Sequence, residues 1–238
     1  MSTQTRPRRA ALPGTARPAP HMSVRPLPAP RRPGRTRVAV VALERQPRFA
    51  ACADQAAGRL AALDGTDLLG DRPPAQMTKK EVPDVLAADA DVLFADGHSF
   101  DSRWFDGAAP DGFLDTELAA VKQPLRAPVL VAYTCSGTSR RFRAALAALR
   151  PADLPPLALL ACDGNAPYTH EVLFAPLLEA LLTDGQGARP WPERLRAALA
   201  AALAGDELAP YTRRHWDRWH VCTVPGTARP RPTPHQEP

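Results

Sequence analysis

Pro128-Val-Leu-Val-Ala-Tyr133, followed by Thr134 and Cys135, is the clearest strand pattern in this chain. Its apolar residues are continuous rather than alternating, which is typical of a strand that is buried on both faces. A second stretch of this kind, Asp91-Val-Leu-Phe-Ala-Asp-Gly-His98, precedes it, and shorter apolar runs occupy 38–43 and 157–161. Strands buried on both faces belong to parallel sheets, so these runs predict a mostly parallel sheet.

Amphipathic segments separate these runs. Apolar residues recur at helical spacing over 49–63, 142–149 and 172–182, and an Ala/Leu-rich segment covers 191–204. Weaker patterns predict a short strand at 68–70, a helix from Thr78 to Ala88 with a capping box, an Asp/Gly-rich loop after His98, and a short helix over 114–121. Strands that alternate with helices predict an α/β fold with helices on both faces of the sheet.

The composition divides the chain into a body and two ends. The 238 residues include 28 prolines, and their net charge is +5. Residues 1–36 hold eight prolines and hardly any branched apolar residue, and residues 225–238 hold five prolines. Such segments bury too little surface to offset their ordering entropy. We therefore predict a disordered Arg/Pro-rich arm at 1–36, one α/β domain at 37–224, and a disordered tail at 225–238.

Charge and cysteine patterns exclude several classes of protein. Residues 1–37 carry nine arginines and no acidic residue, whereas residues 38–224 sum to −5, so a basic nucleic-acid-binding domain loses its support. No apolar run reaches the length of a membrane span, and the N-terminus lacks the apolar segment of a secretory signal. The four cysteines form no CxxC pair, which argues against a zinc ribbon and against a redox motif. We expect a cytoplasmic protein with reduced thiols, no metal site and no cofactor.

Chemistry-bearing residues follow the predicted strands. His98 ends one of these stretches, and Cys135 ends the next strand along the chain. In parallel sheets, functional groups gather beyond the carboxyl ends of the strands, so adjacent strands would bring these two side chains together. A thiolate is a nucleophile, and a neighbouring imidazole activates it. Gly137 allows a tight turn after Cys135, and backbone amides near Cys135 and His98 would face a developing oxyanion.

These residues resemble the caspase-like cysteine peptidases, and most closely their CHAT-domain type. The resemblance rests on 92–99 (VLFADGHS) and 129–137 (VLVAYTCSG), where histidine precedes cysteine at consecutive strand ends. It implies a three-layer caspase-like sandwich and a peptide or protein substrate. It also implies that His98 and Cys135 form a catalytic dyad, with backbone groups of Gly97, Ser99 and Gly137 around the oxyanion. Ser99 stands where the family usually has glycine.

Other residues have two interpretations. Cys162 also ends a strand and is an alternative nucleophile, although core packing is the simpler interpretation. Asp96 would either orient His98 or, more simply, be a solvated carboxylate. Arg140 and Arg141 would hold an acidic substrate group or form a solvated first turn. The segment 215–222 (HWDRWHVC) holds metal-ligand types at a spacing that matches no standard zinc site, so packing on the body or a sheet edge is simpler.

Three functions remain open at this point. The first is a cytosolic cysteine endopeptidase that works through an acyl-enzyme. The second is a catalytically inactive binding module on the same fold, an interpretation that the serine at position 99 favours. The third is a small-molecule hydrolase that uses the same Cys–His pair. The N-terminal arm is a possible site for a protein partner in each case.

Overall fold

The structure is a computed structural model. It describes residues 32–42, 47–69, 82–100, 103–105, 116–118, 121–166, 171–183, 189–204 and 218–227, and we discuss the compact unit Pro33–Pro238. The predicted arm lies outside the described residues as far as position 31. The described part extends to Thr227, three residues into the predicted tail, and the rest of that tail also lies outside it.

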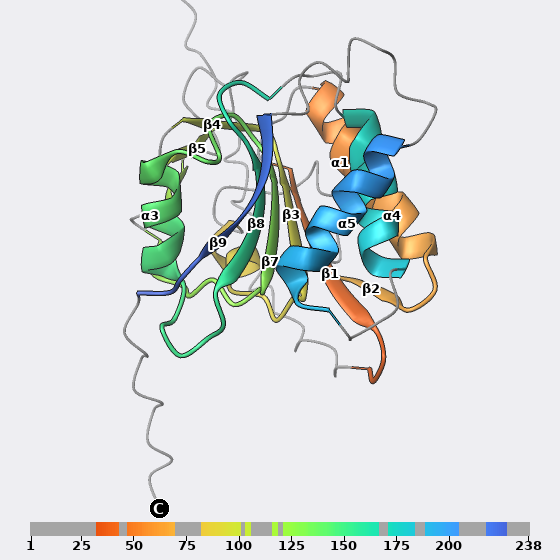
Figure 1. The fold of residues 1–238 in the computed structure, drawn as a ribbon, viewed down its shortest axis with the longest axis horizontal. Coiled ribbons are helices and arrows are strands. Elements are labelled where there is room, and N and C mark those ends of the chain that lie inside the picture. The colour runs from red at the N-terminus through yellow and green to blue at the C-terminus, as the bar shows by residue number, and fades with distance from the viewer. Residues whose placement is uncertain are drawn as a thin grey trace, which may run out of the picture. The chain divides into compact units, whose positions relative to one another are not determined.

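The main sheet has six strands in the order β2-β1-β3-β7-β8-β9 (Figure 1). The first five are mutually parallel, and the edge strand β9 runs antiparallel to β8. These strands are β1 (Thr36–Ala42), β2 (Thr66–Leu69), β3 (Val92–Asp96), β7 (Val129–Tyr133), β8 (Leu157–Cys162) and β9 (Trp219–Val224). The mostly parallel sheet expected from the continuous apolar runs is confirmed.

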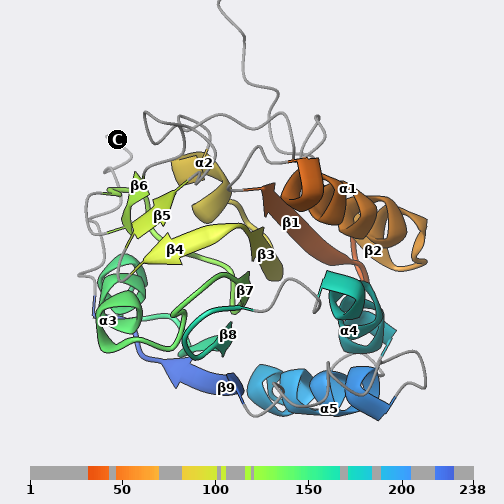
Figure 2. The ribbon, with the colours of Figure 1, turned by 90° about the horizontal axis from the view of Figure 1, so that it is seen from above.

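Helices cover both faces of this sheet. In Figure 1, α3 lies on one side of the strands, while α1, α4 and α5 lie on the other. Figure 2 shows α2 on the same side of the main sheet as α3. Their bounds are α1 (Pro47–Ala62), α2 (Val82–Leu86), α3 (Arg140–Leu149), α4 (Glu171–Thr183) and α5 (Trp191–Ala204). None of the helices that the structure describes combines the length and the apolar character needed to cross a membrane.

Alternate residues of each strand enter two separate cores. On β7, Val129, Val131 and Tyr133 face the core beneath α1, α4 and α5. Leu130 and Ala132 face the core beneath α2 and α3. The central strands β3, β7 and β8 are therefore buried on both sides, because each side meets a helix layer, and this explains their continuous apolar runs.

The loop and the short helix expected after His98 need correction, and the helix expected from Thr78 is described only in part. Where the sequence suggested a loop and a short helix, the chain forms a second, antiparallel sheet of β4 (His98–Phe100), β5 (Arg103–Phe105) and β6 (Thr116–Glu117). These strands have two or three residues, too few to show an alternating pattern. The helix expected from Thr78 is described only as α2, and its capping residues lie outside the described residues.

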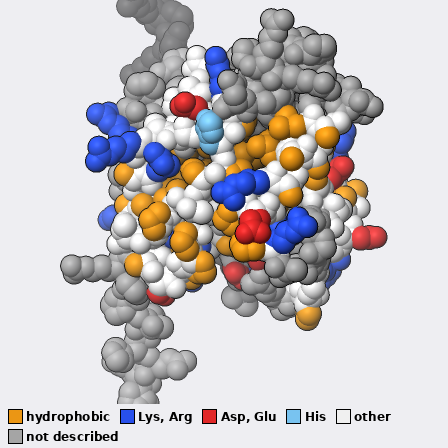
Figure 3. Space-filling view, in the orientation of Figure 1, with side chains coloured by type: hydrophobic (Ala, Val, Ile, Leu, Met, Phe, Trp, Pro, Cys, Tyr) orange, Lys and Arg blue, Asp and Glu red, His pale blue; other side chains and the backbone are white. Residues whose placement is uncertain are grey.

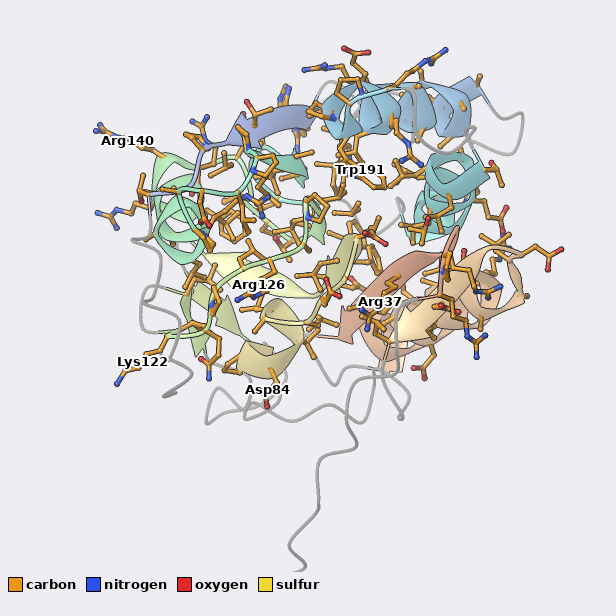
Figure 4. All side chains as sticks on the ribbon, turned by 90° about the horizontal axis from the view of Figure 1, so that it is seen from below. Arg37, Asp84, Lys122, Arg126, Arg140 and Trp191 are labelled. Carbon is orange, nitrogen blue, oxygen red and sulfur yellow. The ribbon has the colours of Figure 1, made fainter. Side chains whose placement is uncertain are left out.

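Two buried arginines, Arg37 and Arg150, lie at the edge of the main sheet where the parallel strands begin, and Figure 4 labels Arg37. The guanidinium of Arg37 lies 2.6 Å from the carboxylate of Asp89, and the backbone N–H of Arg37 donates to Asp91. Arg150, with 1% of its surface exposed, donates to the carbonyl oxygens of Ala127 and Pro155 at 2.8 and 2.7 Å, and more weakly to two others. Burial lowers the pKa of Arg150. Hydrogen bonds thus compensate the desolvation of these groups.

Candidate functional site

The opposite edge of the sheet, at the top in Figure 1 and towards the viewer in Figure 2, holds the predicted catalytic residues. Strands β3 and β7 are hydrogen-bonded neighbours, with Asp96 paired to Tyr133 in the last rung. The backbone N–H of Gly97 extends this ladder by donating to the carbonyl oxygen of Tyr133 at 3.2 Å. The backbones that lead to His98 and Cys135 therefore leave the sheet side by side.

Cys135 lies in a tight turn between β7 and α3. Its residue is half-buried, and the next residue, Ser136, has φ of 52°. Among the described residues, Ser136 is the one non-glycine residue in the left-handed region. Gly137 packs so closely on β8 that a Cβ at this position would lie 2.7 Å from the Cβ of Ala161. Glycine is required here by this close approach to β8.

His98 begins β4 and pairs with Phe105 of β5. The preceding residue, Gly97, is buried and has φ of 144°, which turns the chain from the main sheet into the small sheet. Of His98 and Ser99 the structure describes the backbone. The predicted contact between the imidazole and the thiol therefore lies outside the described part, and it stays a prediction.

Two polar residues that precede the predicted dyad are fully buried. Asp96 has no exposed surface, so the prediction of a solvated carboxylate was wrong. It was wrong because β1 and β7 flank Asp96 on both sides, an arrangement that only the strand order reveals. Thr134 is equally buried, and its hydroxyl has no hydrogen-bond partner among the described residues. Buried polar groups without such partners are rare and need an explanation.

Cys162, the alternative nucleophile, ends β8 and is fully buried. Burial raises the pKa of its thiol to about 12, the neighbouring Cys135 and Asp163 also raise it, and Arg218 opposes this. Its sulfur contacts the carbonyl oxygens of Asp163 and Asn165 at 3.5 and 3.7 Å. A protonated, enclosed thiol is a poor nucleophile, so this environment favours the packing interpretation.

Strand β9 is antiparallel to β8, so its first residue, Trp219, lies where the parallel strands end, close to the predicted site. Trp219 pairs with Cys162, and its ring stacks on that of Tyr133 at 5.7 Å with an interplanar angle of 28°. The backbone N–H of Asp163 donates to the carbonyl oxygen of Arg218. The sequence left two interpretations of the segment 215–222, a metal-ligand cluster or packing on the body or the edge of the sheet. From Trp219 onward this segment is the outermost strand of the main sheet. Sequence spacing gave no sign of these contacts, because they join residues far apart in the chain.

The arginine side chains near the site are exposed. Arg140 and Arg141 in the first turn of α3 are exposed, and Arg140 points away from the body in Figure 4. Figure 3 shows basic side chains gathered over this part of the surface. The arrangement agrees with a solvated first turn. Among the described residues, no three His, Cys, Asp or Glu side chains form a group that could hold a metal ion.

Comparison with known proteins identifies similar folds. No model of a known protein family matches the sequence, and no curated protein is significantly similar to it. The crystal structure of the Arg-specific cysteine proteinase gingipain R (RgpB) matches with a TM-score of 0.52 and 14% sequence identity, over 81% of this chain and 46% of the gingipain chain. A complex of Porphyromonas gingivalis RgpB pro- and mature domains matches with a TM-score of 0.47 and 13% identity, over 81% and 47%.

The gingipain match concerns the fold. It shows that this chain shares the α/β fold of that structure, in agreement with the six-stranded, mostly parallel sheet between two helix layers. The chain spans about half the length of the gingipain chains that it matches.

Proposed function

We propose that this protein is a cysteine peptidase in which Cys135 is the nucleophile and His98 is the general base. The observation that carries the proposal is the hydrogen bond from Gly97 to Tyr133, which continues the β3–β7 ladder to its end. Neighbouring strands lie about 4.8 Å apart, so residues that follow this last rung share one small volume above the sheet edge. The caspase-like fold supports the same assignment.

In the proposed reaction, His98 accepts the proton of the Cys135 thiol, and the thiolate attacks a peptide carbonyl carbon. The C–N bond then breaks as His98 returns the proton to the leaving amine. Water hydrolyses the resulting thioester and restores the thiol. We assign the stabilisation of the oxyanion to the backbone amides of Cys135 and Ser99. The N–H of Gly97 already donates to Tyr133, so the contribution of Gly97 is its backbone conformation.

The buried carboxylate of Asp96 fits a supporting role in this reaction. It lies two residues before His98, inside the rim from which the dyad would project. We propose that Asp96 orients His98 or stabilises its charged form, as carboxylates do in other nucleophile–base pairs. We expect Asp96→Asn to lower kcat and shift the acidic limb of the pH–rate profile. An unchanged profile would assign Asp96 to packing.

The finer features of the proposal follow the resemblance to the CHAT-domain type. They comprise the Cys/His dyad itself, an endopeptidase acting on proteins in the cytosol, and a protein partner that engages the arm at 1–36. The gingipain neighbour is Arg-specific by its name, so substrate panels for this protein should include bonds that follow arginine.

The test is cleavage of a fluorogenic peptide library by wild type and by Cys135→Ala. We expect the variant to lose at least about a thousandfold in kcat/KM, because removal of a nucleophile leaves only binding and oxyanion stabilisation. Cys222→Ala is the matched control, since Cys222 is a half-buried thiol within β9. Equal cleavage by wild type and Cys135→Ala would refute the proposal. Hydrolysis of simple thioesters without peptide cleavage would identify a small-molecule hydrolase, and inactivity of all variants a binding module.

A further inference from the structure

The turn that carries Cys135 is held by the loop after β8. The backbone N–H of Ser136 donates to the carbonyl oxygen of Gly164 at 2.6 Å. Gly164 itself has φ of 72°, so a left-handed residue in each of the two loops forms this contact. A left-handed conformation is unfavourable for a non-glycine residue such as Ser136, so surrounding contacts must maintain it. The position of Cys135 therefore depends on the loop 163–166.

One side-chain hydrogen bond adds to this backbone contact. The hydroxyl of Thr138 donates to Oδ1 of Asp163 at 3.1 Å. The backbone N–H of Asp163 donates in turn to the carbonyl oxygen of Arg218, just before β9, at 2.7 Å. Asp163 thus links the Cys135 turn on one side to the edge strand on the other. Its residue is exposed, so the carboxylate contributes little to the core.

Helix α3 follows the Cys135 turn and fixes its far end, so the path of the turn depends on the bond between Thr138 and Asp163. Ser139 caps α3 by accepting a hydrogen bond from the backbone N–H of Phe142, and Phe142 is fully buried in the core beneath α3. The far end of the turn is therefore fixed by α3 and the near end by β7. Thr138 lies between these anchors, where its bond to Asp163 selects one path for the turn.

We propose that Asp163 is a positioning residue that acts through Thr138 to hold the Cys135 turn in its reactive geometry. This inference rests on the proposed function, in which Cys135 is the nucleophile. Asp163 itself does not touch the substrate in this proposal. Its carboxylate oxygen serves as a hydrogen-bond acceptor, so an amide oxygen at the same place should serve as well.

The test is a double-mutant cycle of Thr138→Val and Asp163→Ala, with Asp163→Asn as the conservative variant. Asp153→Ala, an exposed aspartate in the turn before β8, is the control. The measurements are kcat and KM for a cleaved peptide, and the rate of alkylation of Cys135 by iodoacetamide between pH 6 and 9, followed by mass spectrometry. Alkylation needs no peptidase activity, so a failure of the proposed function remains distinguishable from a failure of this inference.

We expect Thr138→Val and Asp163→Ala each to lower kcat and the alkylation rate about tenfold, with KM unchanged within about twofold, because small displacements of a reacting group have such effects. The double variant should show about the same tenfold loss, since both changes break one link. Asp163→Asn and Asp153→Ala should stay near wild type. The inference would be overturned if the losses of the two single variants multiplied in the double variant. It would also be overturned if Asp163→Asn were as impaired as Asp163→Ala, or if the rates of all variants were unchanged.

Discussion

Buried polar groups differ in their hydrogen bonding between the two edges of the main sheet, the one where the parallel strands begin and the one where they end. At the edge where the parallel strands begin, Arg37 and Arg150 are buried, and each has short hydrogen bonds to a carboxylate or to carbonyl oxygens. At the edge where they end, Thr134 is buried without a hydrogen-bond partner among the described residues, and Ser136 is left-handed.

This difference separates stability from function. Satisfied buried groups lock one conformation and contribute to the free energy of unfolding. Strained or unsatisfied groups cost stability, and they persist in folds chiefly where they serve a site. The contrast therefore supports the edge with Cys135 as the site, independently of the order of histidine and cysteine in the sequence.

The largest effect on stability should come from Arg150→Met. This change leaves the carbonyl oxygens of Ala127 and Pro155 without their donor inside the protein. We expect the free energy of unfolding to fall by about 3 kcal/mol, because buried acceptors that lose a charged donor cost about 1–3 kcal/mol each. Urea denaturation measures this loss. The alkylation rate of Cys135 in the folded protein should not change, and a slower rate would mean that the two edges are coupled.

A pair of glycines gives a direct contrast between the edges. A Cβ at Gly226 would lie 2.3 Å from the carbonyl oxygen of Pro151, and a Cβ at Gly137 would lie 2.7 Å from the Cβ of Ala161. We expect each change to alanine to destabilise the protein by about 1–3 kcal/mol, as overpacking does. Only Gly137→Ala should also slow the alkylation of Cys135. Equal alkylation rates in both variants would break the comparison.

The buried thiol at the site edge predicts an alkaline loss of stability. The pKa of Cys162 is raised from 9.0 to about 12 in the folded protein, so the unfolded chain releases its proton first as the pH rises. The contribution of this group to stability is complete below pH 9 and is lost as the pH rises towards 12. Between pH 8.5 and 10, wild type should lose about 1 kcal/mol more than Cys162→Ala. Urea denaturation of both proteins at the two pH values checks this. An equal loss of stability in wild type and Cys162→Ala would contradict the raised pKa.

The smallest expected effect is a gain. Ser136→Gly relieves the left-handed conformation but adds freedom to the unfolded chain, so we expect stability to rise by about 0.5 kcal/mol. A thermal unfolding scan with Ser139→Gly as a destabilising control would detect it, since that change weakens the cap of α3. A loss of stability in Ser136→Gly would show that the turn is not strained.

Much of the fold could be predicted because the central strands β3, β7 and β8 meet a helix layer on both faces. The resulting run Val129–Tyr133 has no alternation and excludes an exposed sheet. The order of His98 and Cys135 along the chain, together with parallel strands, also predicted that their backbones leave the same edge. Local patterns suffice to locate each strand and its end, whereas the pairing of β3 with β7 is a long-range contact that the structure supplies.

The remaining features depend on long-range contacts. The burial of Asp96 follows from its two neighbouring strands, and the link from Asp163 to Arg218 follows from the antiparallel path of β9. Neither pairing leaves a periodic signal in the sequence. The small sheet β4–β6 was missed for a different reason, since strands of two or three residues are too short to show an alternating pattern.

The stacking of Trp219 on Tyr133 gives the site an optical probe of its own. Tyr133 lies two residues before Cys135, so any shift of that backbone changes the surroundings of the indole. In a variant that keeps Trp219 as the sole tryptophan, emission would report the proposed acylation of Cys135 in real time, without a label and without a chromogenic substrate.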